Sequence, residues 1–440
     1  MPTGQRERGA CQAIVEGGDW ERVLERLVPG WEGRAQEYKA FERRREVRSA
    51  GDLLRLVLGA AVQGWGQPLV ASWAALVGIG QLSGEAVGKR VRKARAWLSA
   101  EVGLLLRLRR EAWAGRSVRV RLVDATTIRE PGGGGAEWRA HALVDLEAGA
   151  LCGLEITDRH GAESLLRQPI EPGEIAVADR VHGRRTDFGQ LLGLGTDLVV
   201  RIGWQNLPLH TPTGHRLDLI DWLQTSVLAP TERAVLVETP TGTYPLRLLA
   251  VALPPAQAEE ARRRVRQAAK KKQRTLDQRT LVAAGFVMLV TTLDPTTWPI
   301  TDVLALYRCR WQIELLFKRL KSIWHLDRLR ARDSESAQAF ILSVILAALL
   351  AGQVSAAAPI PLDAWLDDPA RPLSRWRWET LWHDALLQAI RGPLDLLTLL
   401  RRLPSLQRFL CDSPRRRRHQ ASAARLLLRS LHPHQERLCA

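Results

Sequence analysis

The chain of 440 residues carries a net charge of +17 and has a sequence pI near 10.6, which predicts a polyanionic partner such as nucleic acid. Its five cysteines are scattered without metal-ligand spacing, which excludes a disulfide framework and a cysteine zinc site. The opening segment MPTGQRERGA has no apolar signal core, and the longest apolar run, 340–351, is too short to span a bilayer. We therefore expect a globular cytoplasmic protein with no membrane partner.

Residues 1–115 predict an N-terminal helical domain, because apolar stretches are separated by glycine and proline and no clear strand appears. Within it, the segment 82–98, LSGEAVGKRVRKARAWL, begins near Ser83 and places five cations along one expected helix, namely Lys89, Arg90, Arg92, Lys93 and Arg95. Two interpretations stay open. The segment is either the recognition helix of a helix-turn-helix or a bundle helix with a basic outer face.

From residue 116 to 204 the pattern changes to short β runs separated by turn residues. The expected strands are 118–124, 140–145, 151–157, 175–179 and 198–202. Short connections join the first three, which favours antiparallel neighbours, and an expected helix at 186–194 separates the last two, which favours a parallel crossover. This order of elements resembles an RNase H-like core.

Residues 205–280 interrupt that core with strand-like patches at 234–238 and 244–251 and a strongly basic segment, ARRRVRQAAKKKQR. The core pattern resumes in 281–360, first with an expected strand at 285–291. Residues 361–440 are expected to form a basic C-terminal helical region that contains the arginine run 415–418. The fold class expected is therefore α/β: an RNase H-like core with a mixed sheet and flanking helices, interrupted by a β-rich insertion and preceded by a helical domain.

Two aspartates stand at the ends of expected strands. Asp124 closes the first strand in VRLVDATTI, and Asp179 follows an apolar run in IAVADRVHG. In an RNase H-like topology these positions are neighbours, although aspartate at a strand end is also a common turn former.

The run YRCRWQIELLFKRLK contains Tyr307, Arg310, Glu314 and Lys321, which share one face of an expected α-helix, and its apolar residues fall roughly opposite. A solvated helix face with an i, i+4 ion pair would have the same spacing. With the two aspartates, however, Glu314 would complete three hard oxygen ligands that suit two Mg²⁺ ions and in-line displacement at phosphorus.

The Tyr-Arg-Glu-Lys spacing resembles the signature of the IS4 family of DDE transposases. The resemblance covers about residues 115–420, through DATTI, EWRAHALVDL, GAESL, ADRVHG, LVVRIGWQNLPL and SPRRRRHQ. It implies that Asp124, Asp179 and Glu314 are the catalytic and metal-binding triad, with two Mg²⁺ ions per site for which Mn²⁺ can substitute.

The resemblance also implies DNA contacts. Tyr307, Arg310 and Lys321 would contact phosphates near the cleaved end, and Arg201 in LVVRIGWQNLPL is a further candidate. Phe286 stands where some relatives stack a flipped base, although it also fits an ordinary core position. Trp204 and Trp298 are alternative stacking residues.

The function expected is cut-and-paste transposition of an insertion sequence. The partners would be double-stranded DNA, as the inverted-repeat ends of the element and as target, and a second copy of the chain when bound to DNA; the protein would be associated with the nucleoid. An inactive DNA-binding regulator derived from a transposase is one alternative, against which the presence of all three carboxylates argues. A simple RNase H-like nuclease is another, and the Tyr307 motif and the insertion argue against it.

Overall fold

The computed structural model describes residues 18–129, 138–225, 230–331, 333–392 and 427–428. The expected basic run 415–418 and the opening segment of the chain lie outside these residues. Two compact units are distinguished. A helical unit comprises Met1–Ala112, Thr127–Arg139 and Leu315–Ser422, and a sheet unit comprises Trp113–Thr126, Ala140–Glu314 and Ala423–Ala440.

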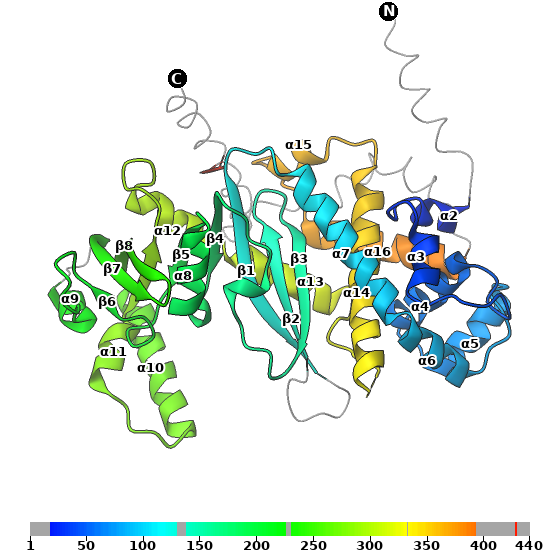
Figure 1. The fold of residues 1–440 in the computed structure, drawn as a ribbon, viewed down its shortest axis with the longest axis horizontal. Helices are drawn as coiled ribbons and strands as arrows, with labels where there is room; N and C mark the ends of the chain where they lie inside the picture. The colour runs from blue at the N-terminus through cyan, green and yellow to red at the C-terminus, as the bar shows by residue number, and fades with distance from the viewer. Residues whose placement is uncertain (1–17, 130–137, 226–229, 332, 393–426, 429–440) are drawn as a thin grey trace, which may run out of the picture. The chain divides into compact units, whose positions relative to one another are not determined.

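The described part of the sheet unit is built on a nine-stranded sheet with the strand order β3-β2-β1-β4-β5-β9-β8-β7-β6 (Figure 1). Its strands are β1 (Arg119–Ile128), β2 (Trp138–Asp145), β3 (Ala150–Asp158), β4 (Glu174–Ala178), β5 (Asp197–Arg201), β6 (Leu209–His210), β7 (Thr231–Thr239), β8 (Gly242–Ala252) and β9 (Phe286–Thr291). Every strand expected from the sequence is present. The mixed α/β sheet with flanking helices is consistent with the RNase H-like core that was predicted.

The sheet changes from parallel to antiparallel pairing at β5. Strand β1 pairs with β4 in parallel. Strand β4 also pairs with β5 in parallel, as the crossover argument predicted for these two strands. Strand β9 then pairs antiparallel with β5, followed by β8, β7 and β6. The strands of the inserted segment therefore extend the same sheet.

A buried ion network fastens β1 to its two neighbours. The side chain of Arg121 is 1% exposed, and its guanidinium contacts Glu174 of β4 at 2.6 Å and Asp145 of β2 at 2.5 Å. Each of the three charges is desolvated, so each depends on the others for stabilisation. The network thus favours the strand order β2-β1-β4, which brings the ends of β1 and β4 to the same edge.

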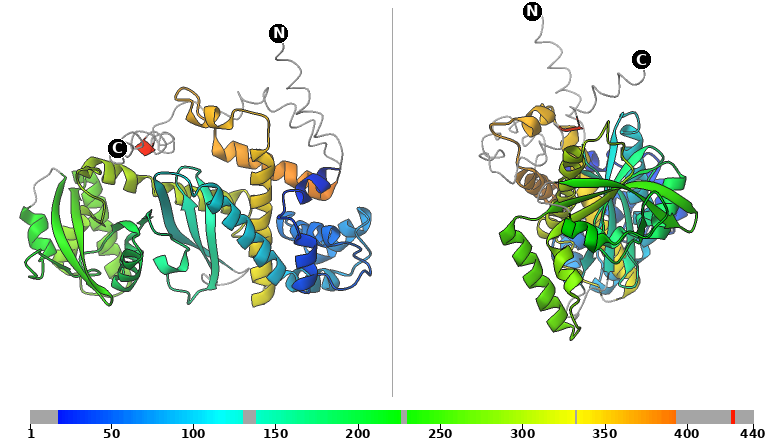
Figure 2. Two further views of the ribbon diagram at one scale, coloured as in Figure 1. Left: turned by 45° about the horizontal axis from the view of Figure 1, so that its top comes forward. Right: turned by 90° about the vertical axis from the view of Figure 1, so that its left-hand side faces the viewer.

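Helices and one long projection complete the sheet unit. The helices are α8 (Arg185–Gly193), α9 (Leu219–Thr225), α10 (Pro255–Lys271), α11 (Gln278–Ala284) and α12 (Ile300–Arg308). Helix α8 packs on β7 and β8, and Phe188 on it is fully buried in the core of the unit. Helix α10 has Ala258 as its one buried residue and projects from the sheet (Figures 1 and 2).

The helical unit combines segments from both ends of the chain. It contains α2 (Asp19–Leu24), α3 (Trp31–Glu37), α4 (Ala50–Val62), α5 (Gln67–Leu76), α6 (Gly84–Lys93), α7 (Arg95–Ala112), α14 (Ser334–Ala356), α15 (Leu362–Asp367) and α16 (Arg375–Arg391). Helix α14 packs against α7, α4, α16 and α6. Arg34 of α3 donates two hydrogen bonds of 2.8 Å to the buried carboxylate of Glu101 on α7.

Two expectations for this unit were wrong. The basic segment 82–98 is not one helix, because α6 ends at Lys93, Ala94 caps it, and α7 begins at Arg95. The apolar run is longer than expected: α14 has 23 residues and is long and apolar enough to cross a membrane by length and composition. However, 78% of its most apolar window is buried inside the protein, as in the central helix of a folded core.

Candidate active site

The two candidate aspartates occupy adjacent parallel strands. Val123 of β1 pairs with Ala178 of β4, so Asp124 and Asp179 follow at matching positions. Asp179 comes directly after β4, as expected, and caps a short 3₁₀ helix, η2 (Arg180–His182). Asp124, in contrast, does not close its strand, because β1 continues to Ile128. Asp124 therefore has β-strand backbone on both sides, which holds its main chain in place.

The environments of these carboxyl groups differ. The side chain of Asp124 is 18% exposed, and its burial raises its pKa to about 6, although the N–H of Ala125 donates to Oδ1 at 2.8 Å. Burial would also raise the pKa of Asp179, but the backbone N–H of Arg180 and the charges of Arg310 and Arg201 outweigh it and lower that pKa. The surroundings thus raise the pKa of Asp124 and lower that of Asp179.

The Tyr307 motif does not lie on one continuous helix, which corrects the sequence interpretation. Helix α12 ends at Arg308, and α13 (Trp311–Ser322) begins after a tight turn. The N–H of Arg310 donates to the carbonyl of Tyr307 at 3.0 Å, and the N–H of Ile313 donates to the carbonyl of Arg310 at 3.1 Å. These i to i+3 bonds replace the α-helical pattern at the junction. The apolar back of α13 is buried, as predicted, at Ile313, Leu316, Leu320 and Ile323.

Arg310 links two of the candidate carboxylates. Its Nη1 donates to Oδ2 of Asp124 at 3.3 Å, and its Nη2 donates to Oε1 of Glu314 at 2.5 Å. The guanidinium also lies 5.9 Å from the ring centre of Tyr307. Burial would lower the pKa of Arg310, but Tyr307, Glu314 and Asp179 raise it, so the side chain is a fixed positive charge among these groups.

Tyr307 connects the third carboxylate. Its hydroxyl donates to Oδ1 of Asp179 at 3.2 Å. Burial, with the charge of Asp179, raises the pKa of Tyr307 to about 12, so the phenol stays protonated and can only donate to that oxygen at neutral pH. Asp124, Asp179 and Glu314 are therefore all linked to one Tyr307–Arg310 pair.

The other predicted residues lie on three elements. Arg201 ends β5 and Phe286 begins β9. Both line one cavity of about 140 Å³, together with Arg180, Trp204 and Met288. Lys321 lies seven residues after Glu314 on α13, and its burial lowers its pKa.

Of the two alternative stacking residues, Trp298 is 6% exposed and has no face available to a base. Trp204 is more open, but the guanidinium of Arg279 lies 5.2 Å from its ring centre.

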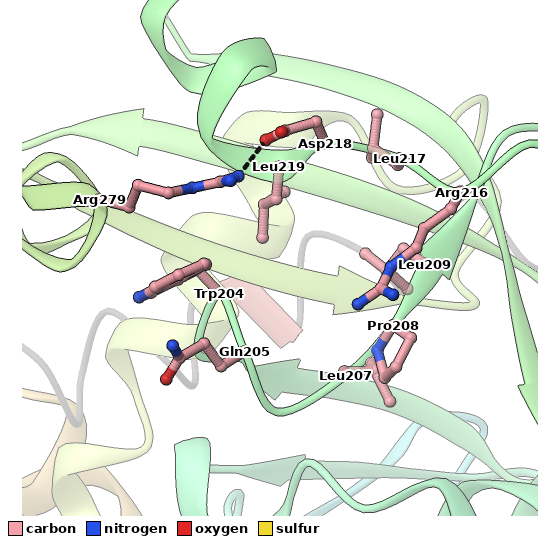
Figure 3. A pocket seen from close by; sticks show the side chains of 10 residues that line it. All are labelled: Trp204, Gln205, Leu207, Pro208, Leu209, Arg216, Leu217, Asp218, Leu219 and Arg279. Atoms are coloured by element: carbon pink, nitrogen blue, oxygen red, sulfur yellow. Dashed lines mark hydrogen bonds and ion pairs between the residues drawn. The ribbon is translucent and has the colours of Figure 1, made fainter. Parts of the chain in front are cut away.

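A second cavity, of about 360 Å³, lies beside Trp204 in the inserted part of the sheet unit (Figure 3). Arg279 closes one side through its 2.5 Å ion pair with Asp218, while Arg216 and Gln205 line another part of the wall. Arg279 thus covers one face of Trp204, the aromatic residue that lines this cavity.

Three residues near the carboxylates were not predicted as site residues from the sequence. Glu163 is an additional carboxylate whose charge contributes to the raised pKa of Asp124. Arg180 donates its N–H toward Asp179 and lines the cavity beside Phe286. His182 is 1% exposed, burial lowers its pKa to about 4, and its Nδ1 has no hydrogen-bond partner among the described residues. Their only sequence signal is membership of the GAESL and ADRVHG segments.

Comparison with known proteins identifies the family. A family model described as "Transposase DDE domain" matches residues 116–350, more than half of the chain. The chain belongs to the DDE transposases. The putative transposase InsL for insertion sequence element IS186A of Escherichia coli (strain K12) is 38% identical over 324 residues, which cover 72% of this chain and 88% of that protein.

Two further transposases are similar to the chain. The transposase for insertion sequence element IS421 of Escherichia coli is 38% identical over 325 residues, with 72% of this chain and 88% of that protein covered. The transposase for insertion sequence element IS231F of Bacillus thuringiensis subsp. israelensis is 25% identical over 267 residues, or 53% and 55% of the two chains. These relatives are consistent with the predicted IS4-family membership. They support the assignment of this chain as a DDE transposase enzyme, which implies DNA as its partner.

Membership of this family implies that the reaction uses divalent metal. Within the described ranges, no three His, Cys, Asp or Glu side chains are arranged close enough to hold a metal ion. The donor chemistry nevertheless fits, because two carboxylates already share a single cation, the guanidinium of Arg310, and carboxylate oxygens are the ligands that hard divalent ions prefer. Asp124 and Glu314 thus offer oxygen ligands of the kind that such an ion would use.

Proposed function

We propose that this transposase binds the inverted-repeat ends of its own insertion sequence, cleaves the phosphodiester bonds there and joins the 3′ ends to target DNA at the nucleoid. The observation that carries the proposal is the convergence of Asp124 and Glu314, which are distant in sequence, on Arg310, with Asp179 held by Tyr307 beside them. A structural ion pair would not require a third carboxylate at the matching position of the next parallel strand.

In this proposal Asp124, Asp179 and Glu314 are the metal ligands, and the site takes two Mg²⁺ ions, for which Mn²⁺ can substitute. Bound divalent ions would activate the attacking oxygen and stabilise the leaving oxygen of an in-line displacement at phosphorus. The protein contributes rigidity, since Asp124 lies within β1 and Asp179 is fixed by η2 at the end of β4. Tyr307 orients Asp179 through its hydroxyl group.

The residues around the carboxylates would position DNA. Arg310, Tyr307 and Lys321 are proposed to contact phosphates near the cleaved bond, where guanidinium and ammonium groups bind strongly. Arg201 and Phe286 line one cavity, which supports a combined role: the cation contacts the backbone, and the ring offers a surface on which a base can stack.

Substitutions that separate cleavage from binding test this proposal. Asp124→Asn, Asp179→Asn and Glu314→Gln should each lower cleavage of a terminal-repeat duplex by at least about 100-fold, because loss of a metal ligand removes several kcal/mol of transition-state stabilisation. Their affinity for the uncleaved duplex should stay near wild type. In contrast, Arg201→Ala and Lys321→Ala should weaken the affinity itself. The readouts are gel-resolved cleavage and fluorescence anisotropy with the same labelled duplex.

An excision assay with a plasmid that carries the element's own ends completes the test. The wild-type chain should both excise and reinsert the element. Excision without reinsertion would support a nuclease, and binding without either would support an inactive regulator. Full strand transfer by any of the three carboxylate variants would overturn the triad.

A further inference from the structure

Arg310 occupies the oxygens that the proposed metal site needs. Its two terminal nitrogens contact Asp124 at 3.3 Å and Glu314 at 2.5 Å, one carboxylate from the sheet and one from α13. The side chain of Arg310 is only 14% exposed, so this contact is largely shielded from solvent. This contact opposes metal binding, because a divalent cation at the same two carboxylates would lie beside a positive charge that already neutralises them.

The same guanidinium is also suited to phosphate. Its planar fork of donors matches the oxygens of a phosphate group as well as those of a carboxylate. Arg310 lies in the turn between α12 and α13 and is not inside either helix. Rotation of its long side chain toward a phosphate would thus not require α13 to unfold, and it would leave Asp124 and Glu314 free.

We propose that Arg310 couples DNA binding to metal binding in this transposase: without DNA it neutralises Asp124 and Glu314 and competes with divalent metal, and a DNA phosphate draws it away and releases both carboxylates. The inference rests on the proposed function, because it takes these carboxylates as metal ligands. It adds that the enzyme binds metal tightly only when DNA is in the site. Free metal alone would then leave the carboxylates largely paired with Arg310.

Tyr307 and the carboxylates favour the binding of a metal ion after Arg310 has moved to a DNA phosphate. Tyr307 holds Asp179 through its hydroxyl, so the phenol keeps that carboxylate in place while the guanidinium moves, and Asp179 offers an initial oxygen ligand. Once the guanidinium has left, Asp124 and Glu314 would face each other as uncompensated charges in a partly buried site, which attracts a divalent cation. DNA binding thus raises metal affinity without any large movement of the fold.

The test measures Mn²⁺ binding to the full-length protein by the electron paramagnetic resonance signal of free Mn²⁺. Wild-type protein should bind Mn²⁺ at least about tenfold more tightly with a pre-cleaved terminal-repeat duplex than without it, a factor typical of coupled sites. Arg310→Gln should bind Mn²⁺ at least about tenfold more tightly than wild type when no DNA is present, and the duplex should add little. Because coupling is reciprocal, Mn²⁺ should tighten duplex binding by a similar factor in wild type only.

Arg308→Gln is the matched control, since it removes the same charge from an exposed position at the end of α12, two residues before Arg310. It should leave both the Mn²⁺ affinity and the coupling near wild type. Equal or weaker Mn²⁺ binding by Arg310→Gln, in protein whose circular dichroism matches wild type, would overturn the proposal. So would wild-type Mn²⁺ affinity that DNA does not change.

A carboxylate variant separates this inference from the function on which it rests. Asp124→Asn should lose tight Mn²⁺ binding with the duplex present. If Asp124→Asn loses tight Mn²⁺ binding and Arg310→Gln binds Mn²⁺ like wild type, the proposed metal site is supported and the proposed coupling is wrong. If Asp124→Asn binds Mn²⁺ normally, the proposed metal site itself is wrong.

Discussion

At the scale of single residues, burial changes what an ionisable group can do. Asp124 and Asp179 have the same side chain and occupy matching positions of neighbouring strands, yet their pKa values move in opposite directions. Two arginines and two hydrogen-bond donors lower the pKa of Asp179, whereas burial and two nearby carboxylates raise that of Asp124. His383 on α16 is a comparable case in the helical unit. Its ring packs edge-on against Trp324 at 4.8 Å, and its Nε2 is buried without a partner among the described residues.

His383 predicts a specific acid sensitivity of the fold. Burial, with the nearby His325, lowers its pKa from 6.5 to about 4. The unfolded chain therefore takes up a proton below pH 6.5 that the folded chain takes up only near pH 4, and stability is lost as the pH falls through that window, by at most about 3 kcal/mol. His383→Phe, which keeps an aromatic contact with Trp324, should flatten the decline.

The measurement for His383 is urea unfolding at pH 7.5, 6 and 5, followed by far-ultraviolet circular dichroism. The midpoint of wild type should drop more between pH 7.5 and 5 than that of His383→Phe. His215→Gln, at an exposed histidine, serves as the control and should follow wild type. Parallel declines of wild type and His383→Phe would show that this histidine does not control the acid response.

At the scale of elements, helix α10 carries two kinds of cation. At its middle, Arg263 and Arg264 both pair with Glu260, at 2.6 and 2.8 Å. Lys270 and Lys271, in its last turn, are exposed and contact no carboxylate among the described residues. Because α10 projects from the sheet, we expect its last turn to contact DNA phosphate without reading sequence (Figure 2).

Two double variants with the same change of net charge test this expectation. Lys270→Gln/Lys271→Gln should weaken binding to any duplex and reduce the slope of log K against log salt by about 0.9 for each phosphate that is no longer neutralised. Arg263→Gln/Arg264→Gln should alter the slope less, since those cations are already paired with Glu260. Glutamine preserves helix propensity in both variants. Equal slopes in the two would count against direct contact by the last turn.

At the scale of the whole molecule, the charge of +17 and the single set of candidate carboxylates in the described chain bear on assembly. An insertion sequence has two ends, and one chain offers one such set. We therefore expect two chains on two paired ends. Mass photometry with terminal-repeat duplexes should detect a complex with two chains of 49.2 kDa and two duplexes. Complexes with one chain and one duplex throughout the range that supports cleavage would contradict this expectation.

Much of the fold was predictable, for a local physical reason. The alternation of apolar residues along β1 and the continuous apolar run of β4 depend only on which side chains can be buried, and both strands were expected within a few residues. The parallel pairing of β4 with β5 followed from the helix between them, α8. The family could also be recognised, because the spacing of Tyr307, Arg310, Glu314 and Lys321 is itself a sequence property.

The local sequence pattern did not predict the ends of helices where no glycine or proline interrupts the sequence. The junction at Cys309 and Arg310 and the junction at Ala94 interrupt helices whose sequences read as continuous. At Cys309 and Arg310 the backbone forms i to i+3 hydrogen bonds, and the residue types there do not predict this change.

What the sequence by itself determined is therefore the set of elements, the acidic residues at the expected sheet edge and the family. Only the tertiary structure decided how those residues interact. The contact of Arg310 with Asp124 joins residues 186 positions apart, and it exists because the fold brings β1 and the turn before α13 together. The raised pKa of Asp124 has the same origin, since desolvation depends on everything that packs around a group and not on its neighbours in the chain.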